Sequence, residues 1–306
     1  MNLVQRLSRI TLICSEPERL AVFYESAFGF ARTGEASITE PAFAKLLGIA
    51  GATARSIALQ LGEQEIELLG VHPLGRSYPR PVLGRSALFQ HFAIVVFNME
   101  SAYARLSARK GWSTISTDGP QLLPLSSGGV TAYKFRDPEG HPLELIAFPS
   151  GATPARWQKY SGAECLGIDH SAISVAATGR SVEYYEGFGL KRTGGSLNIG
   201  PEQGKLDDIV RASVEVTALA PPQIPTPHVE LLCYRGGFDG ETAPPDANDI
   251  AATRLVMKVE SEVALKGLCA QSPGTLLSGP VRFEQGALRA IFRDPDGHLL
   301  TFEASH

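Results

Sequence analysis

The sequence predicts an α+β protein made of four β-α-β-β-β modules, grouped as two halves along the chain. Two observations lead to this class. A motif of aspartate, proline, an acid, glycine and histidine, followed by a short apolar strand, occurs at Asp137 and again at Asp294, 157 residues later. In addition, a strand, a helix and a hairpin recur four times in that order. Repeats of this length indicate a duplicated chain.

The first module can be followed element by element. Alternating apolar residues over 7–14 predict its first strand. Ser15, as a capping residue ahead of acids in the first turn, predicts the start of a helix, and Gly29 predicts its end. Residues 43–47 are a candidate short helix within a glycine-rich stretch, and residues 55–71 predict a hairpin.

Modules two to four follow the same order. Their first strands are expected at 91–97, 170–176 and 253–259, and their helices at 99–110, 179–188 and 262–269. Turn-forming residues are concentrated between the copies of the repeat. We therefore expect a first two-module half at 1–150, a linker at 151–166 and a second two-module half at 167–306.

The repeated motif predicts a tight turn, because proline fixes φ at its second position and glycine accepts a positive φ at its fourth. In the first copy, the strand after the turn carries an acid, Glu144, between apolar residues. A carboxylate in such a place is costly to bury unless it is paired or bound to a cation. Glu144 is therefore the first candidate functional residue.

The composition excludes several classes of function. The 306 residues are 43% hydrophobic and 20% charged, as in soluble globular proteins, and the net charge is only −4. No basic block favours nucleic acid or an anionic membrane as partner. The first residues lack the apolar core of a signal peptide, and four scattered cysteines indicate reduced thiols. We expect a cytoplasmic monomer or homodimer that acts on a small-molecule substrate.

Three stretches carry a resemblance to a known family: the helix signature at 22–30, which has a copy at 183–190, the strand that opens at His91, and the Asp-Pro-x-Gly-His-x-Leu-Glu-Leu close that begins at Asp137. Through them the chain resembles the vicinal oxygen chelate superfamily. This superfamily includes glyoxalase I, extradiol dioxygenases, methylmalonyl-CoA epimerase, and the fosfomycin and bleomycin resistance proteins. The resemblance covers nearly the whole chain, but it indicates the superfamily more clearly than the reaction.

The resemblance implies that two modules close into a cup-shaped mixed sheet with helices packed outside. It also implies that metal ligands come from the first and last strand of each module. Eight positions follow from this rule, in module order: Arg9 and Glu67, His91 and Glu144, His170 and Glu230, Thr253 and Thr301. Complete histidine-plus-glutamate pairs therefore occur only in modules two and three.

Two pairings of the modules are open at this point. If modules two and three share a cup, it gathers His91, Glu144, His170 and Glu230, a set that suits Zn²⁺, Ni²⁺, Co²⁺ or Fe²⁺. If neighbouring modules pair instead, the first cup holds Arg9, Glu67, His91 and Glu144, and the second keeps only His170 and Glu230. We favour the first arrangement, and His91 and Glu144 belong to the richer cup in both.

Other polar residues have simpler interpretations. Glu67 is expected to pair with Arg9 as an internal ion pair, because a cation already occupies that corner. His141 and His298 follow the turn glycine and are expected to stabilise the turn. His228 shares a face with Glu230 and is a minor alternative ligand.

The resemblance implies a glyoxalase I-like lyase or isomerase, in which a divalent metal holds two neighbouring oxygens of the substrate. Glu144 or Glu230 would move the proton, and the pKa of a carboxylate in that role is expected to be raised. Two alternatives are an extradiol-type ring-cleaving dioxygenase and a metal-free protein that binds a drug or antibiotic. The substrate is not indicated.

Overall fold

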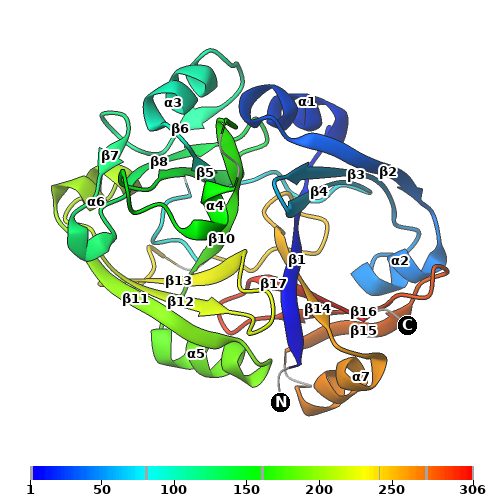
Figure 1. Ribbon diagram of the computed structural model, residues 1–306. Coiled ribbons are helices and arrows are strands. Elements are labelled where there is room, and N and C mark those ends of the chain that lie inside the picture. Colours follow the sequence, from blue (N-terminus) through cyan, green and yellow to red (C-terminus); the bar gives the residue numbers. More distant parts are fainter. Residues whose placement is uncertain (1–2, 80–81, 160–161, 241, 273–274, 305–306) are drawn as a thin grey trace.

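The chain folds into two mixed β-sheets that lie side by side, with helices around them (Figure 1). The computed structural model describes residues 3–79, 82–159, 162–240, 242–272 and 275–304. Within these residues, one sheet has eight strands and the other has nine. None of the helices in the described ranges is both long and apolar enough to cross a membrane.

The eight-stranded sheet combines modules one and four. Its strands are β1 (Val4–Ile13), β2 (Ala31–Ile38), β3 (Thr53–Leu61), β4 (Gln64–His72), β14 (Arg254–Val259), β15 (Leu276–Arg282), β16 (Leu288–Arg293) and β17 (Leu299–Ala304). Their order across the sheet is β15-β16-β17-β14-β1-β4-β3-β2. The two modules meet where β1 runs antiparallel to β14.

The nine-stranded sheet combines modules two and three. Its strands are β5 (Gln90–Val96), β6 (Ser113–Thr114), β7 (Gln121–Leu122), β8 (Thr131–Arg136), β9 (Pro142–Ala147), β10 (Cys165–Ser174), β11 (Lys191–Ile199), β12 (Ser213–Ala220) and β13 (His228–Tyr234). The order is β11-β12-β13-β10-β5-β9-β8-β6, with β7 paired to β8. This topology is the first of the two predicted module pairings, so each half of the chain contributes to both sheets.

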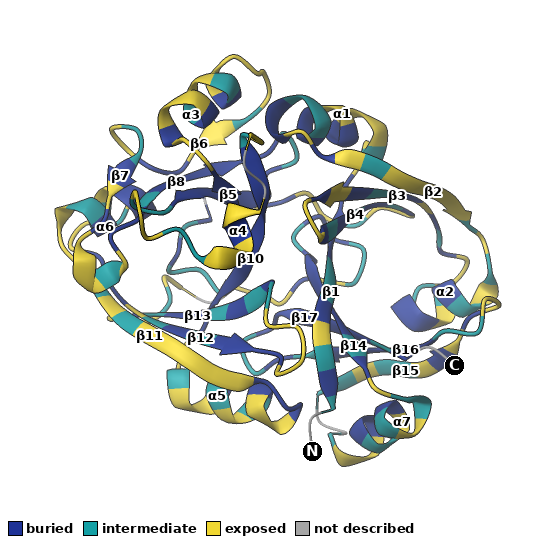
Figure 2. Ribbon diagram, viewed as in Figure 1, coloured by how far each residue is buried: buried dark blue, intermediate teal, exposed yellow. Residues whose placement is uncertain are grey.

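Seven α-helices and one short 3-10 helix connect the strands in the described residues. They are α1 (Pro17–Phe28), α2 (Pro41–Leu47), α3 (Met99–Ser107), η1 (Leu125–Ser127), α4 (Ala155–Gln158), α5 (Thr178–Gly187), α6 (Pro201–Asp207) and α7 (Glu262–Gln271). Helices α1, α3, α5 and α7 lie outside the sheets, with exposed outer faces and buried inner faces (Figure 2). Their inner faces join both sheets in one large hydrophobic core cluster.

The two remaining longer helices, α2 and α6, are copies of one another and lie on the inner faces of the sheets. Helix α2 places Phe43 and Leu47 in an apolar cluster with Ile13, Leu69 and Ile291, so it fills the cup of the eight-stranded sheet. Helix α6 contacts β8 and β11 of the other sheet. The sequence predicted α2 but not α6.

The predicted division into halves stays a prediction. The structure adds that the proposed linker 151–166 contains α4, and that β10 begins at Cys165, inside its last two residues. Residues 160–161 of the linker lie outside the described part of the chain.

The predicted tight turn is present in both copies of the motif. In the first copy, the amide of Gly140 donates to the carbonyl of Asp137 at 3.0 Å, and Gly140 has a φ of 102°. In the second copy, the amide of Gly297 donates to Asp294 at 3.1 Å, with a φ of 107°. Both turns therefore depend on glycine at the fourth position.

The Asp137 carboxylate forms the centre of a buried joint between the sheets. Its Oδ1 accepts from three backbone amides of the turn, and its Oδ2 accepts from the Tyr24 hydroxyl of α1 at 3.0 Å. Oδ2 also lies 2.8 Å from Nδ1 of His141, whose Nε2 lies 2.9 Å from the carbonyl of Ile13 in the other sheet. His141 thus stabilises the turn, as predicted, and also links the two sheets.

The acid of the motif supports a helix of the other module. Glu139 accepts from the Ser15 hydroxyl at 2.7 Å and from the Glu16 amide at 3.2 Å, at the start of α1. The prediction that Ser15 caps this helix is therefore wrong: the cap position is Glu16, and no side chain of the helix caps it. A carboxylate supplied from module two compensates the helix amides instead.

The second copy repeats this arrangement. Asp294 accepts from the Tyr185 hydroxyl at 3.0 Å, and Nε2 of His298 lies 2.8 Å from the carbonyl of Ser174 in the nine-stranded sheet. Asp296 accepts from the amide of Ala176 at 3.1 Å, before α5. The two motifs are therefore a pair of equivalent joints between the sheets.

We predict that Asp137→Ala destabilises the protein by about 3–5 kcal/mol, because it leaves His141 and Tyr24 buried without their shared acceptor. Urea unfolding followed by circular dichroism measures this change. Glu63→Ala, which removes only an exposed ion pair with Lys159, should change stability by no more than about 1 kcal/mol. Equal effects of the two substitutions would contradict the role of the joint.

Candidate metal centre

The nine-stranded sheet brings together the four residues predicted as ligands. His91 lies on β5, Glu144 on β9, His170 on β10 and Glu230 on β13, and all four line one cavity. The positions follow from the register: Glu144 pairs with the residue two after His91, and Glu230 pairs with the residue two after His170. Side chains two apart on a strand share a face, so all four point into the cup.

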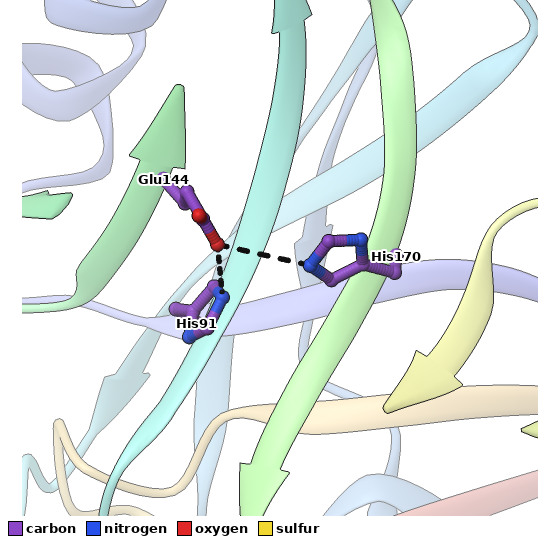
Figure 3. A group of neighbouring side chains, drawn as sticks. All are labelled: His91, Glu144 and His170. Atoms are coloured by element: carbon purple, nitrogen blue, oxygen red, sulfur yellow. Dashed lines mark hydrogen bonds and ion pairs between the residues drawn. The ribbon is translucent and has the colours of Figure 1, made fainter. Parts of the chain in front are cut away.

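Three of the four form the tightest group. Nε2 of His91 lies 2.8 Å from Oε2 of Glu144, and Nε2 of His170 lies 3.8 Å from the same oxygen (Figure 3). The ligand atoms of the three all lie within 4.8 Å of one another. Tetrahedral ligands about 2.1 Å from an ion stand roughly 3.4 Å apart, so the observed separations fit a divalent metal.

Glu230 adjoins this group on the side of His170. Its Oε2 lies 3.5 Å from Nε2 of His170, and its Oε1 lies 3.3 Å from Nε2 of His228. His228, the minor alternative ligand of the sequence, is therefore in contact with Glu230 rather than with Glu144 or His91. A second group with ligand geometry consists of Asp169, His170 and His228.

The charge states of His91 and Glu144 suit metal binding. Burial lowers the pKa of His91, which keeps its imidazole neutral. Burial alone would raise the pKa of Glu144, but the Lys134 ammonium and the two histidines outweigh burial and hold that pKa well below its ordinary value. A neutral imidazole and an ionised carboxylate are the forms that ligate metals.

The surroundings of His170 and Glu230 are strongly coupled. Burial would lower the pKa of His170, but the carboxylates of Glu230, Asp169 and Glu144 raise it well above its ordinary value. The histidines in turn outweigh the burial of Glu230 and lower its pKa. The expectation of a raised pKa at Glu144 or Glu230 is therefore wrong, because cationic neighbours were not visible in the sequence.

Asp169 fixes the orientation of His170. Its Oδ2 lies 3.2 Å from Nδ1 of His170, which turns Nε2 toward Glu144 and Glu230. The register between β10 and β5 shifts between Ile168 and His170, a bulge that lets consecutive residues line the same cavity. A carboxylate behind a ligating histidine is a common second partner in metal sites. Asp169 also accepts from Arg156 and Trp157 of α4.

The cavity beside the group measures about 220 Å³. One of its walls is polar and comes from β8, β11, α6 and β13. The residues of this wall are Lys134, Ser196, Asn198, Gln203 and Tyr234. Apolar side chains, among them Leu123, Val130 and Ile146, close the remaining sides.

Sequence reasoning missed Asp169 and this polar wall. A signal was present, since Pro201–Asp207 repeats the Pro-x-x-x-Lys-Leu pattern of Pro41–Leu47. Where α2 has Phe43 and Leu47, α6 has Gln203 and Asp207. Comparison of the two halves in this stretch would have placed a second short helix over the cup.

The cup of the eight-stranded sheet has arginines where the other cup has histidines. In the nine-stranded sheet, His91 pairs with the residue two after His170, and His170 pairs with the residue two after His91. In the eight-stranded sheet, Arg9 pairs with the residue two after Arg254, and Arg254 pairs with the residue two after Arg9. The two arginines therefore stand where the other sheet has its two histidines. The predicted position Thr253 is therefore wrong by one residue. It follows from aligning Leu106 of the second module with Leu268 of the fourth, but the next residue, Cys269, is buried on α7 as well.

Ion pairs occupy the place of a metal in this cup. Arg9 lies 3.4 Å from Glu67, which confirms the predicted ion pair, and 3.2 Å from Glu303. Ser56 and Thr11 donate to the two oxygens of Glu67, each at 2.8 Å. Glu67 is therefore saturated by protein partners.

A model of the Glyoxalase/Bleomycin resistance protein/Dioxygenase superfamily matches residues 6–145, and the second half repeats the matched one. Over residues 6–145 the chain therefore matches this superfamily. A glyoxalase I mutant from Zea mays has a similar fold, with a TM-score of 0.63 at 17% identity over 98% of this chain and 93% of that one. A candidate dioxygenase from Bacillus subtilis gives a TM-score of 0.59 at 12% identity over 99% of this chain and 86% of that one. A comparison with curated proteins found no match.

We predict that the purified protein binds one divalent metal per chain and not two, because Arg9 and Arg254 repel a cation from the second cup. Elemental analysis after loading with Co²⁺ and desalting measures the ratio. Glu67→Gln should leave the ratio unchanged, whereas Glu144→Gln should lower it. Two ions per chain would contradict the assignment.

We predict that Asp169→Asn weakens Co²⁺ binding by about 10- to 100-fold, because His170 loses the carboxylate that orients it. Competition with a chelating dye measures the affinity, and thermal unfolding checks that the variant is folded. The exposed Asp208→Asn is a matched control and should bind Co²⁺ like the unaltered protein. An unchanged affinity in Asp169→Asn would exclude the orienting role.

Proposed function

We propose that the protein is a metal-dependent enzyme of the glyoxalase I type, a lyase or isomerase. Its substrate would be a small molecule that chelates the metal through two adjacent oxygens. The observation that carries the proposal is the convergence of His91, Glu144, His170 and Glu230, from both halves of the chain, on one cavity.

In this proposal His91, Glu144 and His170 hold the ion, and Glu230 completes the set. The donors suit Zn²⁺, Ni²⁺, Co²⁺ or Fe²⁺. When bound, the metal supplies Lewis acidity that polarises the adjacent oxygens of the substrate. The low pKa of Glu144 and its 2.8 Å contact with His91 make it the firmest anionic ligand.

Glu230 is the better candidate for moving the substrate proton. Its side chain is 21% exposed, compared with 9% for Glu144, and its pKa is lowered less strongly. A carboxylate that is ionised and reachable from the cavity can accept a proton from a bound substrate. His228, 3.3 Å away, then holds its second oxygen in place.

One observation favours the dioxygenase alternative. His91, His170 and Glu144, taken without Glu230, are two histidines and one carboxylate, the ligand set of non-heme Fe(II) oxygenases. Glu230, only 3.5 Å from His170, argues for a fourth ligand and therefore for the lyase or isomerase. The third alternative, a metal-free binding protein, requires that the group holds no metal at all.

We predict that His91→Ala and His170→Ala both abolish bound metal, because one ion is shared between the two halves of the chain. Elemental analysis measures this loss, and the exposed His72→Ala is the control. Loss in only one variant would contradict a shared site, and absence of metal in the unaltered protein would favour the binding protein.

The activity assay separates the two enzyme classes. Proton exchange into D₂O, measured by NMR on a panel of α-hydroxycarbonyl compounds, should occur with the unaltered protein. In Glu230→Gln, the rate of this proton exchange should fall by about 100-fold or more, which is the usual contribution of a general base. Oxygen uptake with catechols, dependent on Fe²⁺ and without proton exchange, would instead establish a dioxygenase.

A further inference from the structure

A buried lysine lies beside the metal centre, on the strand next to that of Glu144. Lys134 on β8 is the antiparallel partner of Glu144 on β9, so both side chains point into the same cup. Lys134 is only 4% exposed and lines the cavity together with the candidate ligands. A lysine in this position is costly to bury, which calls for an explanation beyond packing.

Asp207 on α6 holds this lysine. Its Oδ1 accepts from Nζ of Lys134 at 2.7 Å. Its Oδ2 accepts from Nε2 of Gln203 at 2.7 Å and from the hydroxyl of Tyr234 at 3.0 Å. The carboxylate is thus fully used by protein donors, and it fixes Lys134 at the cavity wall.

Two polar groups of this wall keep capacity for a ligand. An ammonium has three N–H donors, and in the described part of the chain Nζ of Lys134 makes one hydrogen bond, to Asp207. Oε1 of Gln203 is buried and, among the described residues, has no hydrogen-bond partner. Gln203 is 3% exposed and lines the same cavity. The wall therefore offers a cationic donor and a neutral acceptor at once.

The copy of this wall in the other cup shows that these groups are not needed for folding the module. At the positions of Gln203 and Asp207, α2 has Phe43 and Leu47, which pack into an apolar cluster. At the position of Lys134, 157 residues later, β16 has Ile291, which packs in the same apolar cluster. The polar wall is thus found only beside the metal centre.

The cavity also limits the size of the ligand. Its volume of about 220 Å³ is below the range of roughly 300–1,000 Å³ typical of sites for drug-sized molecules. A compound of about ten non-hydrogen atoms fits such a volume, but a large conjugate does not fit inside it.

We propose that Lys134 selects the substrate by binding a carboxylate on a small metal-chelating acid. This inference rests on the proposed function, because it places one end of the substrate at the metal. The substrate class is therefore a small hydroxy or oxo acid with a second carboxylate. Lys134 binds the carboxylate that does not chelate.

The test compares two acids that differ only at the end facing Lys134. In 2-hydroxyglutarate a carboxylate replaces the terminal methyl group of 2-hydroxypentanoate. Each acid is titrated into Co²⁺-loaded protein, and the visible absorption of cobalt reports binding. We expect the unaltered protein to prefer 2-hydroxyglutarate by about 10- to 100-fold, the range of a hydrogen bond to a charged group.

Two variants separate recognition from structure. Lys134→Met should remove most of the preference, which is the ratio of the two affinities measured in the same variant. Asp207→Asn leaves the ammonium without its counterion, so the preference should be kept or increased. A purely structural role of the pair predicts instead that both variants weaken both acids alike. Asp207→Asn decides the question even if Lys134→Met does not fold.

Failure of the role of Lys134 can be distinguished from failure of the proposed function. If cobalt does not bind at all, the proposed function is overturned, and the inference with it. If cobalt binds normally but the unaltered protein shows no preference, or Lys134→Met keeps the preference, the role of Lys134 is overturned while the metal centre stands.

Discussion

The antiparallel pairing of β5 with β10 is the contact on which the candidate site depends. It joins a strand of the first half of the chain to a strand of the second, and it sets His91 opposite Ala172 and His170 opposite Ala93. Because each histidine strand also pairs in parallel with its glutamate strand, one register determines four side chains. The buried joints at Asp137 and Asp294 connect this sheet to the eight-stranded sheet.

The two cups have the same backbone arrangement but differ in their charged side chains. In the nine-stranded sheet, carboxylates surround neutral or titratable histidines, so a divalent cation can complete the charge balance. In the eight-stranded sheet, Arg9 already supplies a permanent cation, and Glu67 is saturated by it and by two hydroxyl groups. An apolar helix then fills the space where a substrate would lie. One cup therefore has a candidate metal centre, and the other is filled by ion pairs and apolar side chains.

Sequence patterns predicted the module order, the turn motif and the four converging residues, because these depend on local turn chemistry and on strand alternation. They missed what depends on long-range contact. Asp169 lines the cavity only because of a bulge in β10, and Asp207 meets Lys134 across 73 residues of sequence. The pKa directions of Glu144 and Glu230 could not be predicted, since they depend on cations that lie on other strands. The error at Thr253 came from aligning helices, where two consecutive buried residues are equally acceptable partners.

The candidate site combines one module from each half of the chain, and this affects how the site responds to dilution. If modules two and three belonged to separate chains, the site would form only when those chains met, and its occupancy would fall with protein concentration. The stretch between β9 and β10, which includes α4, keeps the two modules at a fixed effective concentration instead. The candidate ligands, drawn from two repeats, therefore stay together in a single molecule however dilute it becomes.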